Sequence, residues 1–249
     1  MSDLAAVLQD LAPTGRVRAA INFGNPVLAH PDKANGEPTG VSVDLAREIA
    51  ARLGVGIELV TFDAAGKVTA AVKTGVWDIA FLAIDPARAV DITFTAPYVV
   101  IEGSYIVRED SPLRFIDDFD RADIRIAVGR GAAYDLFLSR ALKQAKLVRA
   151  DTSAGAVDLF VDSGLDAAAG VRQPLLAYAE QTPGFRVIPG RFTVIEQAVC
   201  APRGREAGVV WLRSFVEEMK ACGFVAAALE RHQQRDAAVA PPADRGSPI

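Results

Sequence analysis

The chain has few of the residues on which common catalytic and metal sites depend. Its 249 residues include two histidines and two cysteines. Cys200 and Cys222 match neither a CxxC pair nor a zinc-ligand spacing, so we interpret them as independent thiols; a disulfide between them is the alternative that the sequence leaves open. His30 and His232 are each isolated among polar residues, which argues against a histidine metal site or a Ser-His-Asp triad. We therefore expect no metal, no cofactor and no catalytic residues.

Basic blocks and long apolar runs are also missing. The net charge is −4, aromatic residues make up 7%, and Lys and Arg form no cluster. Nucleic-acid binding requires a basic face, so nucleic acid is not an expected partner. No stretch approaches the roughly 20 apolar residues of a membrane span, so we expect no membrane insertion. The N-terminus lacks the basic and apolar regions of a secretory leader. The sequence as it stands predicts a cytoplasmic protein, or a periplasmic one if a leader was removed.

Short β-type runs alternate with helical stretches, which indicates an α/β fold. In the stretch 44–54, Leu45, Ile49 and Leu53 recur at helical spacing and Gly54 follows at the position of a helix stop. We expect Asp44 to be an acid in the first turn of that helix, where the helix dipole favours it.

The strand and helix pattern occurs twice, once over about residues 16–84 and again over about 123–190. Two similar α/β lobes make a cleft between them the expected ligand site. A strand at 194–202 and a helix or helix pair at 206–232 follow. The remaining residues, 236–249, are rich in Pro and Ala without periodicity, and we expect them to be disordered.

Several motifs stand in a characteristic order, and they are "GVSVDLAREIAARLG", "VKTGVWD", "DPAR", "DITFTAPY" and "IRIAVGRGAAYDLFL". They resemble the family 3 solute-binding proteins of amino-acid ABC transporters, over about residues 16–232. The resemblance implies a two-lobe, type II periplasmic-binding-protein-like fold. Lobe 1 would comprise residues 1–107 and 193–235, and lobe 2 residues 108–192. Hinge strands near 105–108 and 193–198 would let the lobes close on a ligand. An ABC permease is then the implied partner.

The resemblance also implies how a ligand carboxylate is held. Arg88 falls at the family's arginine clamp, and a planar guanidinium suits a carboxylate because it donates two parallel charge-assisted bonds. The alternative is a surface arginine at the start of a helix. In the second lobe, the backbone N–H groups of Gly131, Ala132 and Ala133 would point at an anion from the start of a helix. The family's hydroxyl side chains in this turn are replaced by alanine.

Other positions depart from the family. Leu82 and Ala83 stand where the family has Ser or Thr, and no acid lies near Val171, where the family's Asp pairs with a ligand ammonium. Three alternatives follow. The ligand lacks an ammonium group and is held by Arg88 and Arg172, or Glu102 or Glu196 near the hinge replaces the Asp, or the site is degenerate.

The end of the first strand completes the candidate site. Asn22, Phe23 and Asn25 would contact a ligand's amine or cover its side chain. The predicted function is capture of a small carboxylate-bearing ligand without chemistry. The alternative is an enzyme similar to cyclohexadienyl dehydratases, in which Glu196 or Glu102 acts as general acid.

Overall fold

The computed structural model describes residues 3–243, which form two α/β units. Unit 1 is Met1–Asp63, Lys67–Val100 and Glu196–Ile249, of which residues 1–2 and 244–249 lie outside the described residues. Unit 2 is Ala64–Gly66 and Ile101–Ile195. Apart from the short stretch Ala64–Gly66, the chain passes between the units at Val100–Ile101 and at Ile195–Glu196. These two passages lie inside continuous strands, β6 (Ile92–Arg108) and β11 (Thr193–Pro202), so no break in the sequence marks them.

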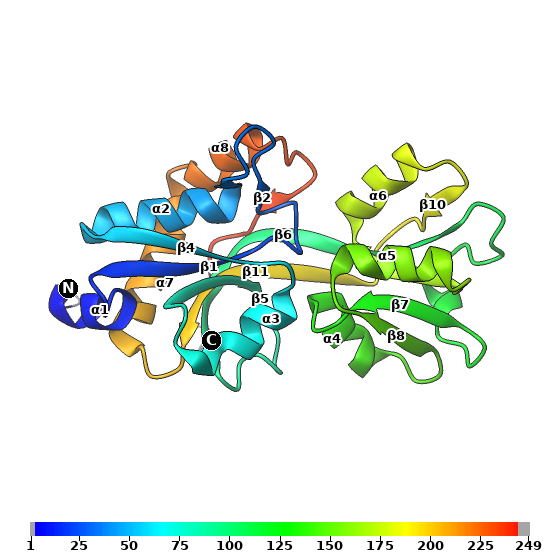
Figure 1. Cartoon of the computed structure of the whole chain (residues 1–249), viewed down its shortest axis with the longest axis horizontal. Coiled ribbons are helices and arrows are strands. Elements are labelled where there is room, and N and C mark those ends of the chain that lie inside the picture. Colours follow the sequence, from blue (N-terminus) through cyan, green and yellow to red (C-terminus); the bar gives the residue numbers. More distant parts are fainter. Residues whose placement is uncertain (1–2, 244–249) are drawn as a thin grey trace. The chain divides into compact units, whose positions relative to one another are not determined.

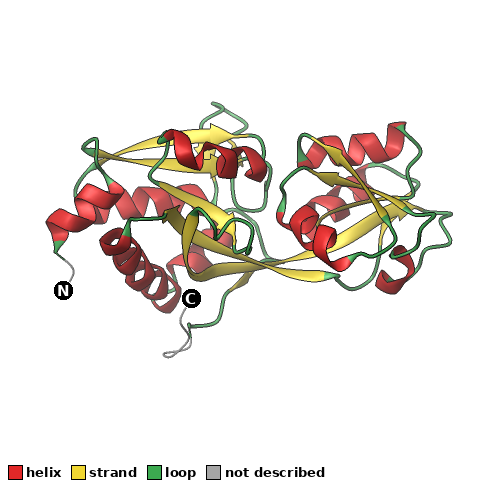
Figure 2. Ribbon diagram, turned by 90° about the horizontal axis from the view of Figure 1, so that it is seen from below, coloured by secondary structure: helices red, strands yellow, loops and turns green. Residues whose placement is uncertain are grey.

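Unit 1 is a mixed sheet in the order β4-β1-β5-β11-β6, with helices packed against it (Figures 1 and 2). β1 is parallel to β4 and β5, and β11 is antiparallel to β5. The remaining elements are α1 (Leu4–Leu11), β1 (Arg16–Asn22), β2 (His30–Pro31), β3 (Pro38–Thr39), α2 (Val41–Leu53), β4 (Gly56–Phe62), α3 (Ala65–Ala70), the 3-10 helix η1 (Ala71–Thr74), β5 (Ile79–Ala83), α7 (Glu206–Ala221), α8 (Phe224–Arg231) and β12 (Ala238–Val239).

Helix α2 confirms the prediction made from apolar spacing. Leu45, Ile49 and Leu53 are all buried, and Gly54 ends the helix in the left-handed conformation with φ 67°. The helix begins at Val41, so Asp44 lies in its first turn as expected. The Asp44 carboxylate additionally accepts a hydrogen bond from Arg231 and pairs with the His232 ring, which joins α2 to the end of α8.

Unit 2 is built on strands in the order β6-β9-β7-β8, with β10 also paired to β6. β7 is parallel to β8 and β9, as the repeated strand and helix pattern predicts. Its elements besides β6 are the 3-10 helix η2 (Ile116–Phe119), β7 (Arg125–Gly129), α4 (Ala133–Ala141), β8 (Lys146–Ala150), α5 (Ser153–Asp162), β9 (Ala167–Val171), α6 (Arg172–Gln181) and β10 (Phe185–Val187). Tyr105 and Phe119 stack at 3.9 Å in its core, which anchors η2 on β6.

The C-terminal segment is ordered further than its composition suggests. β12 pairs antiparallel with β6, with Ala238 opposite Val100 and Val239 opposite Val99. Ala240 is 3% exposed, and its N–H donates to the Tyr98 carbonyl. The expectation of disorder is therefore wrong for residues 236–243, while 244–249 lie outside the described residues. Strand pairing uses backbone groups and needs no apolar side-chain pattern, which is why the composition did not reveal it.

Within residues 3–243, no helix has the length and apolar character needed to cross a membrane. Cys200 is buried and Cys222 is exposed, and both are free thiols.

Candidate functional site

In unit 1, the turn after β1 is fixed at the ends of two parallel strands. Asn22 ends β1 and its Oδ1 accepts the Gly24 N–H at 2.9 Å. The Phe23 N–H donates to the carbonyl of Phe62, the last residue of β4, at 2.8 Å. Asn25 is 7% exposed, and its buried Oδ1 has no hydrogen-bond partner within residues 3–243. Buried polar atoms are nearly always hydrogen-bonded, so the Asn25 Oδ1 marks a place where a donor would fit.

Arg88 follows β5 and is buried rather than lying on the surface. Its side chain and backbone together are 2% exposed, and Nη1 donates to the Ala83 carbonyl at 2.8 Å. Burial lowers the pKa of Arg88 to about 10, against the opposing attraction of Asp85. The guanidinium therefore still carries its charge at neutral pH. The structure excludes the alternative of a surface arginine and leaves a buried cation held at the end of a strand.

The residues that precede Arg88 in β5 contribute no polar side chains at positions 82 and 83. Leu82 and Ala83 are 1% and 3% exposed in β5, and Ala83 contributes only its carbonyl, to Arg88. Glu196 lies on the neighbouring strand β11, where its carbonyl accepts the Ile84 N–H. The Glu196 side chain is exposed, and no partner of its carboxylate is found in the described chain.

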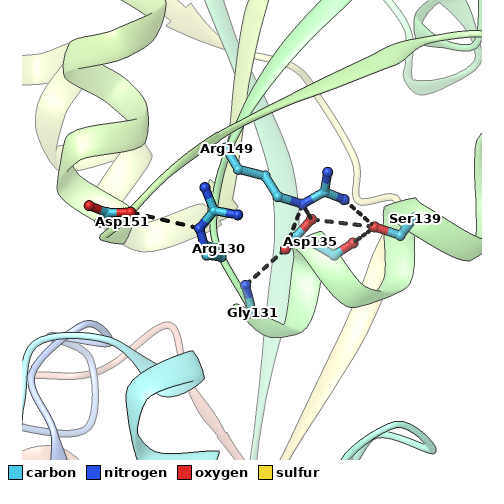
Figure 3. Close-up of polar contacts among 6 residues, drawn as sticks. All are labelled: Arg130, Gly131, Asp135, Ser139, Arg149 and Asp151. Carbon is cyan, nitrogen blue, oxygen red and sulfur yellow. Dashed lines mark hydrogen bonds and ion pairs between the residues drawn. The ribbon is translucent and has the colours of Figure 1, made fainter. Parts of the chain in front are cut away.

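In unit 2, the turn after β7 uses most of its expected anion donors internally (Figure 3). The Gly131 N–H donates to Asp135 Oδ2 at 2.8 Å, and the Ala132 N–H donates to the Gly129 carbonyl at 3.0 Å. Of the three donors expected from the sequence, only the Ala133 N–H has no acceptor among the described residues. The expectation that all three point at a ligand therefore needs correction, because the chain supplies its own carboxylate.

Asp135 was not singled out from the sequence. It lies in the first turn of α4 and is 3% exposed. Its carboxylate is paired with Arg149 on β8, with Nε at 3.0 Å from Oδ1. Its place at the third residue of α4 was the available signal, because acids there often reach back to the N–H groups that precede a helix.

The two charged candidates of unit 2 besides this turn are both held within that unit. Arg172 begins α6 and its Nη1 donates to the carbonyls of Ile188 and Gly190, at 3.3 and 2.6 Å. Glu102 is ion-paired with Arg191 at 2.5 Å. Val171 precedes Arg172 as the N-cap of α6, so the structure places no acid at that point.

These surroundings also bear on catalysis and metal binding. A carboxylic acid acts as a general acid where an apolar pocket that excludes water raises its pKa. The Glu196 side chain is exposed instead, and Glu102 is ion-paired with Arg191. Neither residue has the environment that the dehydratase alternative requires. Within the described chain, no group of three or more His, Cys, Asp or Glu could hold a metal ion.

Solved structures share this fold along nearly the whole chain. A mutant of ArgBP from T. maritima matches with a TM-score of 0.79 and 21% identity, covering 92% of this chain and 100% of that chain. A solute receptor for L-cysteine of Neisseria gonorrhoeae matches with a TM-score of 0.78 and 24% identity, covering 92% of each chain. The ancestral amino acid-binding protein AncCDT-1, a precursor of cyclohexadienyl dehydratase, matches with a TM-score of 0.75 and 24% identity, covering 90% of this chain and 98% of that chain.

Comparison of sequences is consistent with the motifs. No curated protein matches the chain. A family does match, over residues 19–235, which include all of unit 2, most of unit 1 and every candidate residue named above. The chain belongs to the bacterial extracellular solute-binding proteins, family 3.

Proposed function

We propose that this solute-binding protein captures a small carboxylate-bearing molecule with residues of both units, by hinge closure and without chemical conversion. The observation that carries the proposal is Arg88, a buried guanidinium at the end of β5 in the position of the family's carboxylate clamp. A planar guanidinium donates two parallel charge-assisted hydrogen bonds to a carboxylate, which favours a carboxylate-bearing ligand at this position.

The ligand class depends on whether a cationic group can be accommodated. Glu102 is already paired with Arg191, so it is a poor replacement for the missing acid near Val171. The exposed Glu196 remains as the candidate partner of an ammonium. We therefore retain two classes: an amino acid whose ammonium meets Glu196, or an organic acid without an ammonium.

A thermal-shift screen of the purified protein tests the proposal directly. The panel contains L-arginine, L-cysteine, pyruvate, succinate and benzoate. A molecule that binds only the folded state at 100 times its Kd stabilises by roughly 2.7 kcal/mol, which is visible as a rise in Tm. A rise with at least one carboxylate is expected. No rise with any carboxylate, followed by no heat of binding in calorimetry, would contradict the proposal.

Substitution of Arg88 tests the clamp. Arg88→Met keeps most of the apolar volume but removes the fork, and we expect about a 100-fold loss of affinity from the missing charge-assisted bonds. Arg88→Lys keeps the charge and should lose less. The matched control is Arg47→Met, which removes an exposed arginine of α2. Circular dichroism checks that each variant folds, and equal affinities for Arg88→Met and Arg47→Met would rule the clamp out.

Glu196→Gln separates the two ligand classes. If the ligand is an amino acid, loss of the carboxylate should weaken its binding by about 10-fold or more, since hydrogen bonds to charged groups contribute about 1.5–3 kcal/mol. If the ligand lacks an ammonium, affinity should be unchanged or slightly higher. Titration calorimetry with the best molecule of the panel distinguishes these results.

We further propose an ABC permease as the partner and an extracytoplasmic place of work. The support is the family itself, whose members are described as extracellular. Osmotic-shock fractionation of a producing bacterium tests the compartment. Recovery of the protein only with the cytoplasmic fraction would contradict it and would remove the permease from consideration.

A further inference from the structure

We infer that Asp135 is a positioning residue of the ligand site: its buried carboxylate fixes the turn of residues 129–133, so that the Ala133 N–H is presented to an anion. This inference rests on the proposed function, because it assigns a role within the same site. It adds a residue that does not contact the ligand and acts through the backbone of the turn.

Two donors from different parts of unit 2 converge on this carboxylate (Figure 3). The Gly131 N–H donates to Oδ2 at 2.8 Å, and Arg149 Nε lies 3.0 Å from Oδ1. The Ser139 hydroxyl donates to the Asp135 backbone carbonyl at 2.7 Å, lies 3.4 Å from Oδ1 and accepts from Arg149 Nη2 at 2.8 Å. Asp135 is thereby tied to the turn before α4, to the next turn of α4 and to strand β8.

The geometry makes Asp135 suited to hold the turn. Gly131 has φ 68°, in the left-handed region that glycine adopts readily but which is one of several conformations open to it. A hydrogen bond from its N–H to a side chain four residues later selects this conformation. Asp135 reaches back beyond the N-cap Ala132, much as the acid of a capping box does, and its negative charge is favoured by the start of the helix.

The consequence for binding is pre-organisation. A turn already held in its bound conformation does not lose freedom when the ligand arrives, so affinity is higher than for a mobile turn. Arg149 neutralises the Asp135 charge, so the carboxylate can lie beneath an anion site without repelling the anion. Asp135 also occupies the Gly131 N–H, which leaves the Ala133 end of the turn for the ligand.

The experiment compares Asp135→Ala, Asp135→Asn and the control Asp151→Asn. Asp151 belongs to the same region and its carboxylate lies 3.7 Å from Arg130 Nε, but its side chain is 85% exposed and no bond from it to Gly131 is found. Hydrogen exchange at the amides of residues 130–134 is measured without ligand. We expect about a tenfold or greater acceleration at Gly131 in Asp135→Ala. In Asp135→Asn, whose amide oxygen still accepts, and in Asp151→Asn, exchange should stay near the wild-type rate.

Affinity is then measured by calorimetry with L-arginine, L-cysteine, pyruvate and succinate as probes. For the probe that wild-type protein binds most tightly, we expect Asp135→Ala to weaken binding by about tenfold. Asp135→Asn should recover most of this loss, and Asp151→Asn should stay within about twofold. Recovery by the amide is the result that a merely destabilised fold would not give.

The outcomes separate this inference from the proposed function. If no probe or wider panel member binds the wild-type protein, the proposed function fails, and with it the ligand role of Asp135. If wild-type protein binds but Asp135→Ala keeps its affinity or its Gly131 exchange rate, this inference alone is overturned. Should Asp135→Ala not fold, Asp135→Leu takes its place, because it removes both carboxylate oxygens while filling a similar volume. Wild-type exchange at Gly131 and wild-type affinity in that variant would overturn the inference equally.

Discussion

Asp78 shows how a single carboxylate can organise unit 1. It is completely buried just before β5, and its oxygens accept the Arg18 backbone N–H at 3.1 Å, Nε at 2.8 Å and Nη2 at 2.7 Å. Arg18 belongs to β1, so the pair joins two adjacent strands of the sheet. A buried charge without its partner is much more costly than the intact pair is favourable.

We predict that Asp78→Ala lowers the free energy of unfolding by about 3–5 kcal/mol, because it leaves the Arg18 cation and backbone N–H without their acceptor. Urea denaturation measures this change. The control is Glu58→Ala, since the Arg16–Glu58 pair is 3.9 Å apart and half-exposed, and such pairs contribute about 0–1 kcal/mol. Equal losses of unfolding free energy in the two variants would show that the Arg18–Asp78 pair stabilises the fold no more than the exposed Arg16–Glu58 pair.

Asp120 provides a contact whose strength depends on pH. Its half-buried carboxylate accepts the backbone N–H groups of Gln144, Lys143 and Ala145, at 2.7, 2.9 and 3.1 Å, and these bonds lower its pKa below the ordinary 3.8. Because the folded protein has the lower pKa, the stabilisation is complete above 3.8 and is lost as the pH falls through the folded-state pKa.

We therefore predict that Asp120→Asn lowers Tm at neutral pH, and that the difference from wild type shrinks below pH 3.8 and disappears once Asp120 is protonated. Thermal melts at a series of pH values test this, and NMR titration of the carboxyl carbon reports the pKa itself. A difference in Tm that is independent of pH would contradict the conclusion that the ionised Asp120 carboxylate stabilises the fold.

At the scale of elements, the C-terminal strand β12 is held by both β6 and α7. The Lys220 side chain of α7 is 4% exposed, and its Nζ donates to the carbonyls of Pro97 at 3.2 Å and Pro241 at 2.9 Å. The ammonium of Lys220 thus connects α7 to β6, just before the residues that pair with β12, and to the segment that follows β12.

Truncation after Gln234 should destabilise unit 1, because it removes β12 and exposes the β6 backbone near Val99 and Val100. Loss of several hydrogen bonds and buried small side chains corresponds to a fall in Tm of several degrees, at about 2–4 °C per kcal/mol for a chain of this size. Calorimetry gives Tm, and hydrogen exchange at Val99 and Val100 should accelerate. An unchanged Tm with unchanged exchange would mean that the segment contributes nothing to the strand.

At the scale of the whole molecule, two continuous strands, β6 and β11, carry the chain between the units. A small number of connections is the condition for hinge motion of otherwise rigid units. If the proposed function holds, the best-binding carboxylate of the thermal-shift panel should reduce the radius of gyration in small-angle X-ray scattering. At the same concentration, this molecule should leave the radius of gyration of the Arg88→Met variant unchanged. A bound ligand without any change in scattering would speak against hinge closure.

The family and the type of each unit could be predicted from the sequence, and they are confirmed. The spacing of Leu45, Ile49 and Leu53 with Gly54 predicted α2, and the ordered motifs predicted the solute-binding family. These features are local, because apolar periodicity and a left-handed glycine act within a few residues. The candidate ligand residues, with Arg88 foremost, stay a proposal that rests on motif position.

Tertiary structure decided which groups already have partners. It assigned the Gly131 N–H to Asp135, Glu102 to Arg191, Arg172 to the carbonyls of Ile188 and Gly190, and residues 238–239 to the side of β6. Most of these contacts join residues far apart in the chain. Hydrogen bonds and ion pairs act over a few ångströms in space, and only the folded backbone brings such groups within that distance.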